Sequence, residues 1–205
     1  MTVERVKVFD LDDTLISRGP PARILGLAGG KIRPHRPPNL SSQQIAKLNI
    51  GHHKVDGNIH GFFEQLSFSV HAGRSMIPGV RQELERFDKE GFDIYGNTGR
   101  SNKAPWVDMT EKTLENGGVK YFFKDIFYTP DGIKTAVSKA HGIHVLLTRY
   151  SNLEFYDDDP RTALFIARTF PNIQVNLVQY GTTGLLVARS EMEQVSNLRR
   201  IAVLG

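Results

Sequence analysis

The chain has 205 residues but no cysteine, and no apolar run in it is long enough for a membrane-spanning helix. Without cysteine, disulfides, thiolate metal sites and a cysteine nucleophile are excluded. A helix that crosses a bilayer needs roughly 20 predominantly apolar residues, so none is expected. The first residues also lack the apolar core of a signal peptide. These absences favour a cytoplasmic protein.

The net charge of +4 is small, but it is unevenly distributed along the chain. Residues 17–76 contain eight lysine and arginine residues and two acidic residues, so this segment carries +6 and the remainder −2. A basic segment within a slightly acidic protein favours a polyanionic partner, such as a nucleotide or a nucleic acid. The alternative is a solvated loop whose charges only increase solubility.

Residues 17–76 also lack a regular apolar pattern. Glycine and proline are frequent in the first part of this segment, which is typical of turns and loops. A short helix is expected at residues 41–48. A regular apolar pattern returns only at Ile77. The expected organisation is therefore a core of residues 1–16 and 77–205, with residues 17–76 as an insertion.

In the core, short apolar runs alternate with amphipathic segments. The apolar runs are typical of strands, and the segments between them have helical spacing. This alternation predicts an α/β fold, in which a three-layer, Rossmann-like parallel sheet carries helices on both faces. The expected strands are residues 5–10, 92–95, 125–128, 153–156 and 173–178. Residues 191–199 are expected to be helical.

Pairs of carboxylates follow two of these strands. Asp10 and Asp12 come after the first strand, and Asp157 and Asp158 come after the fourth. Parallel sheets bind ligands beyond the carboxyl ends of their strands, so these acids are expected to converge. Two like charges about 4 Å apart cost about 4 kcal/mol at an effective dielectric constant of about 20, so a cation is expected among them. Oxygen ligands alone favour Mg²⁺.

Some of these patterns also have purely structural interpretations. Residues 12–14 contain Asp-Asp-Thr, which occurs in turns and helix caps. Residues 98–100, Thr-Gly-Arg, follow a strand. The same composition is found in turns between a strand and a helix that bind no ligand. Asp159 precedes Pro160, so we expect Asp159 to be the N-cap of a helix and not a metal ligand.

Four motifs in the chain occur in an order that resembles the haloacid dehalogenase-like (HAD) superfamily. They are Asp10-Leu11-Asp12-Asp13-Thr14, Thr98-Gly99-Arg100, Lys134 at the start of a helix, and Asp157-Asp158. Lys124 and Lys139 are weaker candidates for the lysine of the third motif. The resemblance implies the HAD core fold, with residues 17–76 as a cap over the active site.

The resemblance also implies a mechanism. Asp10 is expected to be the nucleophile that forms an aspartyl-phosphate, and Asp12 the general acid and base. Thr98 and Lys134 are expected to stabilise charge on the transferring phosphoryl group. The further substrate contacts are expected from Asn97, Gly99 and Arg100. The expected Mg²⁺ ligands are Asp10, Asp12, Asp157 and Asp158.

Three functions are consistent with these residues. The first is a Mg²⁺-dependent phosphatase that acts on a small phosphorylated metabolite or nucleotide. The second is a phosphatase that acts on nucleic-acid ends, and the third is a non-catalytic phosphate-binding protein with the same fold. The complete set of motif side chains disfavours the third. Asp12 argues against a dehalogenase, because that branch of the superfamily does not need the acid.

Overall fold

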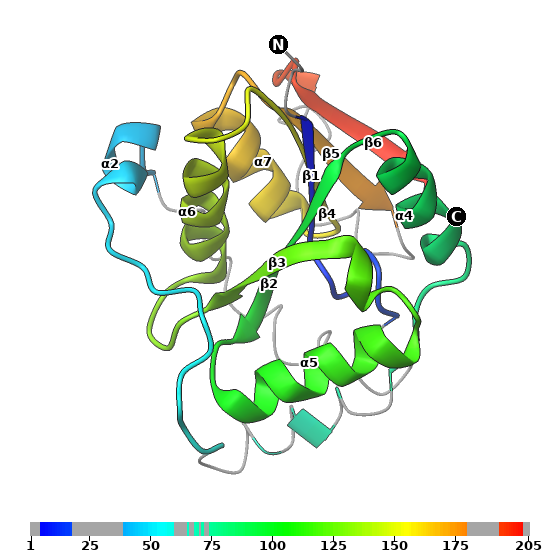
Figure 1. The fold of residues 1–205 in the computed structure, drawn as a ribbon. Helices are drawn as coiled ribbons and strands as arrows, with labels where there is room; N and C mark the ends of the chain where they lie inside the picture. The colour runs from blue at the N-terminus through cyan, green and yellow to red at the C-terminus, as the bar shows by residue number, and fades with distance from the viewer. Residues whose placement is uncertain are drawn as a thin grey trace.

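The computed structural model of the protein describes residues 5–17, 39–59, 65, 68, 69, 71, 74–179 and 193–202. Its centre is a six-stranded sheet in the order β3-β2-β1-β4-β5-β6, and every pairing is parallel (Figure 1). The strands are β1 Arg5–Phe9, β2 Asp93–Ser101, β3 Phe123–Thr129, β4 Asn152–Asp157, β5 Gln174–Gln179 and β6 Leu198–Ala202.

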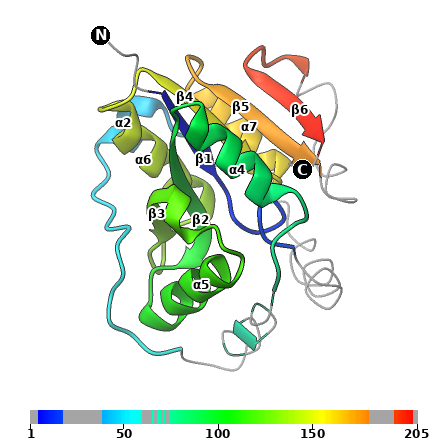
Figure 2. The ribbon, with the colours of Figure 1, turned by 45° about the vertical axis from the view of Figure 1, so that its right-hand side comes forward.

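Helices cover both faces of this sheet, as Figures 1 and 2 show. Helices α2, α6 and α7 contribute to the apolar core on one face, and α4 and α5 contribute to the core on the other. The helices are α2 Ser42–Ala46, α4 Val80–Lys89, α5 Ala104–Asn116, α6 Thr135–Leu147, α7 Pro160–Thr169 and the 3₁₀ helix Lys120–Phe122. The three-layer α/β fold expected from the sequence is therefore confirmed. Among the described residues, no helix has both the length and the apolar character that crossing a membrane requires.

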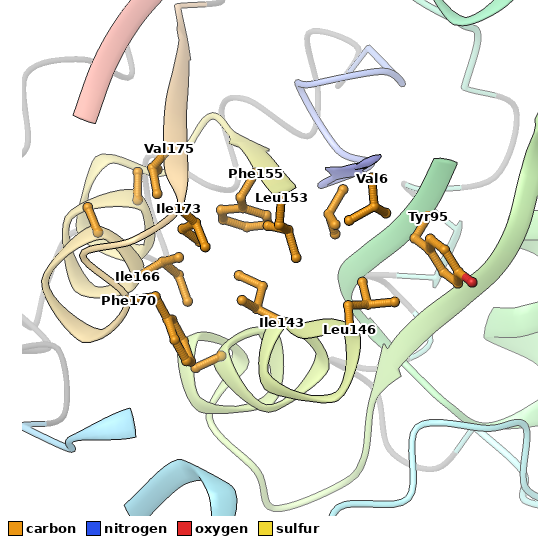
Figure 3. Close-up of a cluster of buried hydrophobic side chains, with 14 of the residues drawn as sticks. Val6, Tyr95, Ile143, Leu146, Leu153, Phe155, Ile166, Phe170, Ile173 and Val175 are labelled. Carbon is orange, nitrogen blue, oxygen red and sulfur yellow. The ribbon is translucent and has the colours of Figure 1, made fainter. Parts of the chain in front are cut away.

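One apolar core lies on each face of the sheet. Figure 3 shows the core between the sheet, α6 and α7, where Val6, Ile143 and Phe155 come together. Because successive side chains of a strand point to opposite faces, β1 contributes Val6 and Val8 to this core and Phe9 to the other. Burial on both faces explains the apolar residues of this strand, whereas the buried Lys7 is paired with Glu154 at 2.9 Å.

The end of the chain differs from the expectation. Residues 191–199 were expected to be helical. Residues 191 and 192 lie outside the described residues, but Leu198 and Arg199 belong to β6 (Leu198–Ala202), which pairs with β5. Leu198 packs against the core on the α6 side, and Ile201 packs against the core on the α4 side, so this strand has apolar contacts on both faces of the sheet.

The segment of residues 17–76 leaves and rejoins the core at one place. Ile16 and Met76 form an isolated antiparallel bridge, and the Ser17 N–H donates a hydrogen bond of 3.0 Å to the Ser75 carbonyl. The domain boundaries and the cap function expected for this segment stay predictions. The glycine- and proline-rich residues 18–38 lie outside the described residues.

Residues 39–59 run alongside α6 and β3 (Figure 1). The expected helix at 41–48 is present as the shorter α2, which Ser41 caps at its N-terminus and which buries Ile45 in the core on the α6 side. Further along, the Val55 N–H donates to the Asn102 carbonyl at 2.9 Å, and the Ala104 N–H donates to the Val55 carbonyl at 3.0 Å. This segment therefore supports the chain that follows β2.

A pair of buried histidines also joins residues 39–59 to the core. His52 Nδ1 lies 2.9 Å from the Tyr128 carbonyl oxygen, and His52 Nε2 lies 2.9 Å from His141 Nδ1 of α6. A carbonyl oxygen can only accept, so Nδ1 carries the proton of a neutral His52, which leaves Nε2 as the nitrogen that faces His141. Burial lowers the pKa of both histidines below the ordinary value.

These lowered pKa values predict that acid weakens the fold. In the unfolded chain, His52 and His141 take up protons near pH 6.5, but in the folded protein they do so only at lower pH. The folded state is therefore most stable above about pH 6.5, and its free energy of unfolding decreases as the pH falls from there through the lower pKa values of the folded protein. We expect the urea midpoint to decrease between about pH 7 and pH 5, with a smaller decrease in His52→Gln. His53→Gln alters an exposed neighbour and serves as the control. An unchanged pH slope in His52→Gln would contradict the assignment.

Candidate active site

The carboxyl ends of β1, β2 and β4 lie side by side in the middle of the sheet. Phe9 is in register with Gly96 of β2 and with Tyr156 of β4. The Asp10 N–H donates a hydrogen bond of 2.8 Å to the Tyr156 carbonyl, which places Asp10 next to Asp157. The parallel register thus brings together two carboxylates that are far apart in sequence.

Three of the expected acids form a buried cluster. One carboxylate oxygen from each of Asp10, Asp157 and Asp158 lies within 4.8 Å of the other two. The three residues are 4%, 0% and 3% exposed, respectively. Asp12, which the resemblance placed among the metal ligands, does not belong to this group. Asp159 is the N-cap of α7, as expected, and its N–H also donates to Asp157 at 2.8 Å.

A lysine ammonium lies among these carboxylates, but it belongs to Lys139 and not to Lys134. Lys139 Nζ is 2.9 Å from Asp10 Oδ1 and 2.7 Å from Asp157 Oδ2. Lys134 is exposed at the N-cap of α6, whereas Lys139 lies roughly one and a half turns further along, on the buried face of the helix. The expectation for Lys134 is corrected in this respect. The sequence signal that could have identified Lys139 is its position in the apolar middle of the helix, before Ala140 and Ile143, where a charged side chain needs a partner.

The charges of this cluster depend on one another. Burial would lower the pKa of Lys139, but the charges of Asp10 and Asp157 raise it, so the ammonium stays charged. Burial raises the pKa of Asp157, and the charges of Asp10 and Asp159 act in the same direction against Lys139. One ammonium, that of Lys139, thus lies among the carboxylates of this cluster.

Asp12 is held separately, by two arginines. Arg100 donates from Nε to Asp12 Oδ2 at 3.0 Å and from Nη2 to Oδ1 at 2.7 Å, and Arg74 Nη1 lies 2.6 Å from Oδ1. Burial alone would raise the pKa of Asp12, but Arg100, with His71 and Arg74, holds the pKa well below its ordinary value. The carboxylate is therefore ionised and fixed in orientation.

This arrangement changes the assignment of Arg100, which was expected to contact substrate. Its guanidinium is buried, and its third donor, Nη1, is bonded to Thr110 Oγ1 of α5 at 3.0 Å. Arg100 therefore orients Asp12. The contact of Arg74 with Asp12 was not foreseen, because Arg74 lies 62 residues away in the irregular segment and no local pattern marks it.

The remaining expected residues of β2 point in different directions. Thr98 is fully buried, and its hydroxyl accepts a hydrogen bond of 3.2 Å from the Arg100 N–H. Asn97, which was expected to bind substrate, donates to the backbone of Lys139 instead. At Gly99 an added Cβ would lie 2.9 Å from Thr135 Cγ2, so glycine allows the start of α6 to approach β2.

The first motif forms a turn as soon as β1 ends. Asp13 has a φ of +60°, and its N–H donates to the Ile16 carbonyl at 2.7 Å, so it is the turn residue. Asp10, Asp12 and Thr14 therefore do not alternate along one extended strand. Thr14 is fully buried in this turn.

Comparison with known proteins identifies the fold. No protein-family model matches the chain, and no curated protein matches it by sequence. A haloacid dehalogenase-like hydrolase from Streptococcus pneumoniae has a similar structure over 98% of this chain and 95% of its own, with a TM-score of 0.56 and 14% identity. The fold is therefore that of the HAD-like hydrolases.

Other solved structures with this fold have different described activities. A predicted phosphoglycolate phosphatase from Haemophilus somnus matches over 93% of this chain and 92% of its own, with a TM-score of 0.57 and 17% identity. An L-2-haloacid dehalogenase matches over 91% and 92%, with a TM-score of 0.51 and 15% identity. At such identities the similarity defines the fold and leaves the reaction to the site.

The contacts of Lys139 predict a large difference between the two lysines of α6. In protein treated with a chelator, Lys139→Met leaves buried carboxylates without their ammonium, and we expect it to lower the free energy of unfolding by about 3–5 kcal/mol. Lys134→Met alters an exposed side chain and should change it by less than about 0.5 kcal/mol. Urea denaturation measures both values. Equal effects of the two substitutions would contradict the assignment.

Proposed function

We propose that the protein is a Mg²⁺-dependent phosphatase of the HAD superfamily, and that Asp10 is its nucleophile. The observation that carries this proposal is the position of Asp10. Its buried carboxylate lies at the carboxyl end of the central strand β1, 2.9 Å from the Lys139 ammonium and beside Asp157 and Asp158. A carboxylate held in this way is oriented and lies close to a cation that favours an anionic substrate.

The carboxylate cluster fits a magnesium ion. Its donors are oxygens only, as Mg²⁺ prefers, and they lie close enough to share one ion. A divalent cation bound there would reduce the repulsion among the carboxylates of Asp10, Asp157 and Asp158. When bound there, Mg²⁺ would supply a positive charge that polarises the phosphoryl oxygens.

The protein's own residues would perform the chemical steps. A carboxylate oxygen of Asp10 attacks phosphorus, and the bond between phosphorus and the leaving oxygen breaks, which forms an aspartyl-phosphate. The Lys139 ammonium and the Thr98 hydroxyl stabilise negative charge on the transferring group. Water then hydrolyses the aspartyl-phosphate and regenerates Asp10.

Asp12 would act as the base of the second step, because its ionised carboxylate can take a proton from the attacking water. To act as the acid of the first step, it must first take up a proton, which requires that Arg100 and Arg74 release its carboxylate oxygens. A haloacid dehalogenase has no use for such a group, so the ordered Asp12 favours the phosphatase over the dehalogenase reaction.

The nucleophile assignment predicts the effect of one conservative substitution. Asp10→Asn keeps the shape of the side chain but removes its nucleophilic charge, so phosphate release from an aryl phosphate should decrease by about 10⁴-fold or more. Activity of the unaltered protein should require Mg²⁺ and disappear with a chelator. Asp108→Asn, on an exposed face of α5, serves as the control and should keep full activity. Wild-type turnover in Asp10→Asn would refute the assignment.

We propose a small phosphorylated metabolite or a nucleotide as substrate, and nucleic-acid ends as the second candidate. The net charge of +6 in residues 17–76 supports the second. Arg33 and Arg36 belong to the same segment but lie outside the described residues.

The two substrate classes differ in their dependence on salt. Binding that neutralises several phosphates weakens steeply as salt increases, whereas binding of one phosphate weakens little. Neutralising Arg33, Arg36 and Lys54 together should raise the KM for a phosphorylated oligonucleotide and leave the KM for an aryl phosphate unchanged. An equal increase for both substrates would exclude the nucleic-acid candidate.

A further inference from the structure

We propose that Asn97 is a positioning residue, whose amide sets the place of the Lys139 ammonium against Asp10 and Asp157. The catalytic consequence of this inference rests on the proposed phosphatase function. The structural part, which concerns the environment of Lys139, does not.

Asn97 is directed away from the substrate side of β2. Successive side chains of a strand alternate, so Asn97 shares a face with Tyr95, which packs in the core on the α6 side. Thr98 lies on the opposite face, together with Arg100, which reaches Thr110 of α5. Asn97 is only 1% exposed, so it can act on the site only through the residues that it contacts.

The contact of Asn97 is with the turn of α6 that carries Lys139. Its Nδ2 donates a hydrogen bond of 2.9 Å to the Lys139 carbonyl oxygen. On the next turn, a Cβ added to Gly142 would lie 2.9 Å from Asn97 Nδ2 and 3.3 Å from Asn97 Oδ1. The amide thus fills the space that the absence of a side chain at Gly142 leaves open.

Simple packing does not explain an asparagine at this position. A buried amide is unfavourable unless its polar groups are bonded, and among the described residues no group donates to Asn97 Oδ1. The Lys139 carbonyl lies within a helix and does not need a second partner, although its other lone pair can accept one. The hydrogen bond therefore adds little to the helix itself, and what it provides is a fixed distance between α6 and β2.

That distance matters because the Lys139 ammonium contacts two strands at once. Asp10 follows β1 and Asp157 ends β4, and the ammonium lies within 2.9 Å of a carboxylate oxygen of each. The strand that bears Asn97 is the neighbour of β1 and also bears Thr98. The Asn97 amide thus fixes the position of Lys139 relative to the sheet that also carries Asp10 and Thr98. In an active site, a shift of about 1 Å in a reacting group can lower the rate about 10²-fold.

Two substitutions separate the hydrogen bond from the packing. Asn97→Ala removes both, whereas Asn97→Ala combined with Gly142→Ala returns a methyl group to the vacated space and still lacks the hydrogen bond. We expect kcat for an aryl phosphate to decrease about tenfold or more in both variants, with little change in KM. The urea midpoint should recover in the double variant, but kcat should not.

The Lys139 ammonium gives a readout that does not depend on activity. In chelator-treated protein labelled with ¹⁵N-lysine, its NMR signal is assigned by its absence in Lys139→Met. We expect this signal to shift or broaden in Asn97→Ala and in the double variant. Asn176→Ala, which alters a buried asparagine of β5, is the control and should leave the signal unchanged.

The outcomes distinguish the two proposals. A signal that changes in both Asn97 variants but not in Asn176→Ala supports the positioning role, even if the unaltered protein releases no phosphate. A signal that is unchanged in Asn97→Ala overturns it, as does a kcat that recovers together with the urea midpoint in the double variant. In the latter case Asn97 is only a packing residue.

Discussion

A single ammonium among buried carboxylates is the interaction on which the candidate site depends. Lys139 Nζ bridges Asp10 and Asp157, which come from two neighbouring strands. Removing such charges from water is costly, and the attraction between them offsets this cost only when the geometry is accurate. The central sheet and α6 supply that geometry, and the three carboxylates place oxygen atoms close enough together to hold one metal ion.

Asp12 links this site to the irregular segment of residues 17–76. Of the two arginines that contact Asp12, Arg100 belongs to β2 and Arg74 belongs to the segment. Arg74 lies close in sequence to Met76, where the segment rejoins the core beside Ile16. The position of the segment and the orientation of the proposed acid and base are therefore physically connected.

Much of the fold could be predicted from the alternation of apolar runs and helical segments, because that pattern reflects burial on both faces of a parallel sheet. The prediction failed at Leu198 and Arg199, which were expected in a helix but lie in β6, where pairing with β5 decides the conformation. It also gave no sign of the contact between His52 and His141, since neither residue belongs to a local pattern. Contacts between distant segments leave no periodic trace in the sequence.

The sequence by itself determined which strands end in carboxylates and that Asp159 caps a helix, because both are local properties of a few neighbouring residues. Only the tertiary structure decided which lysine meets Asp10, since that depends on the face of α6 that packs against the sheet. It likewise decided that Arg100 and Arg74 hold Asp12 and that Asn97 faces α6. These contacts join residues up to 88 positions apart, so packing of the whole chain, and no local preference, sets them.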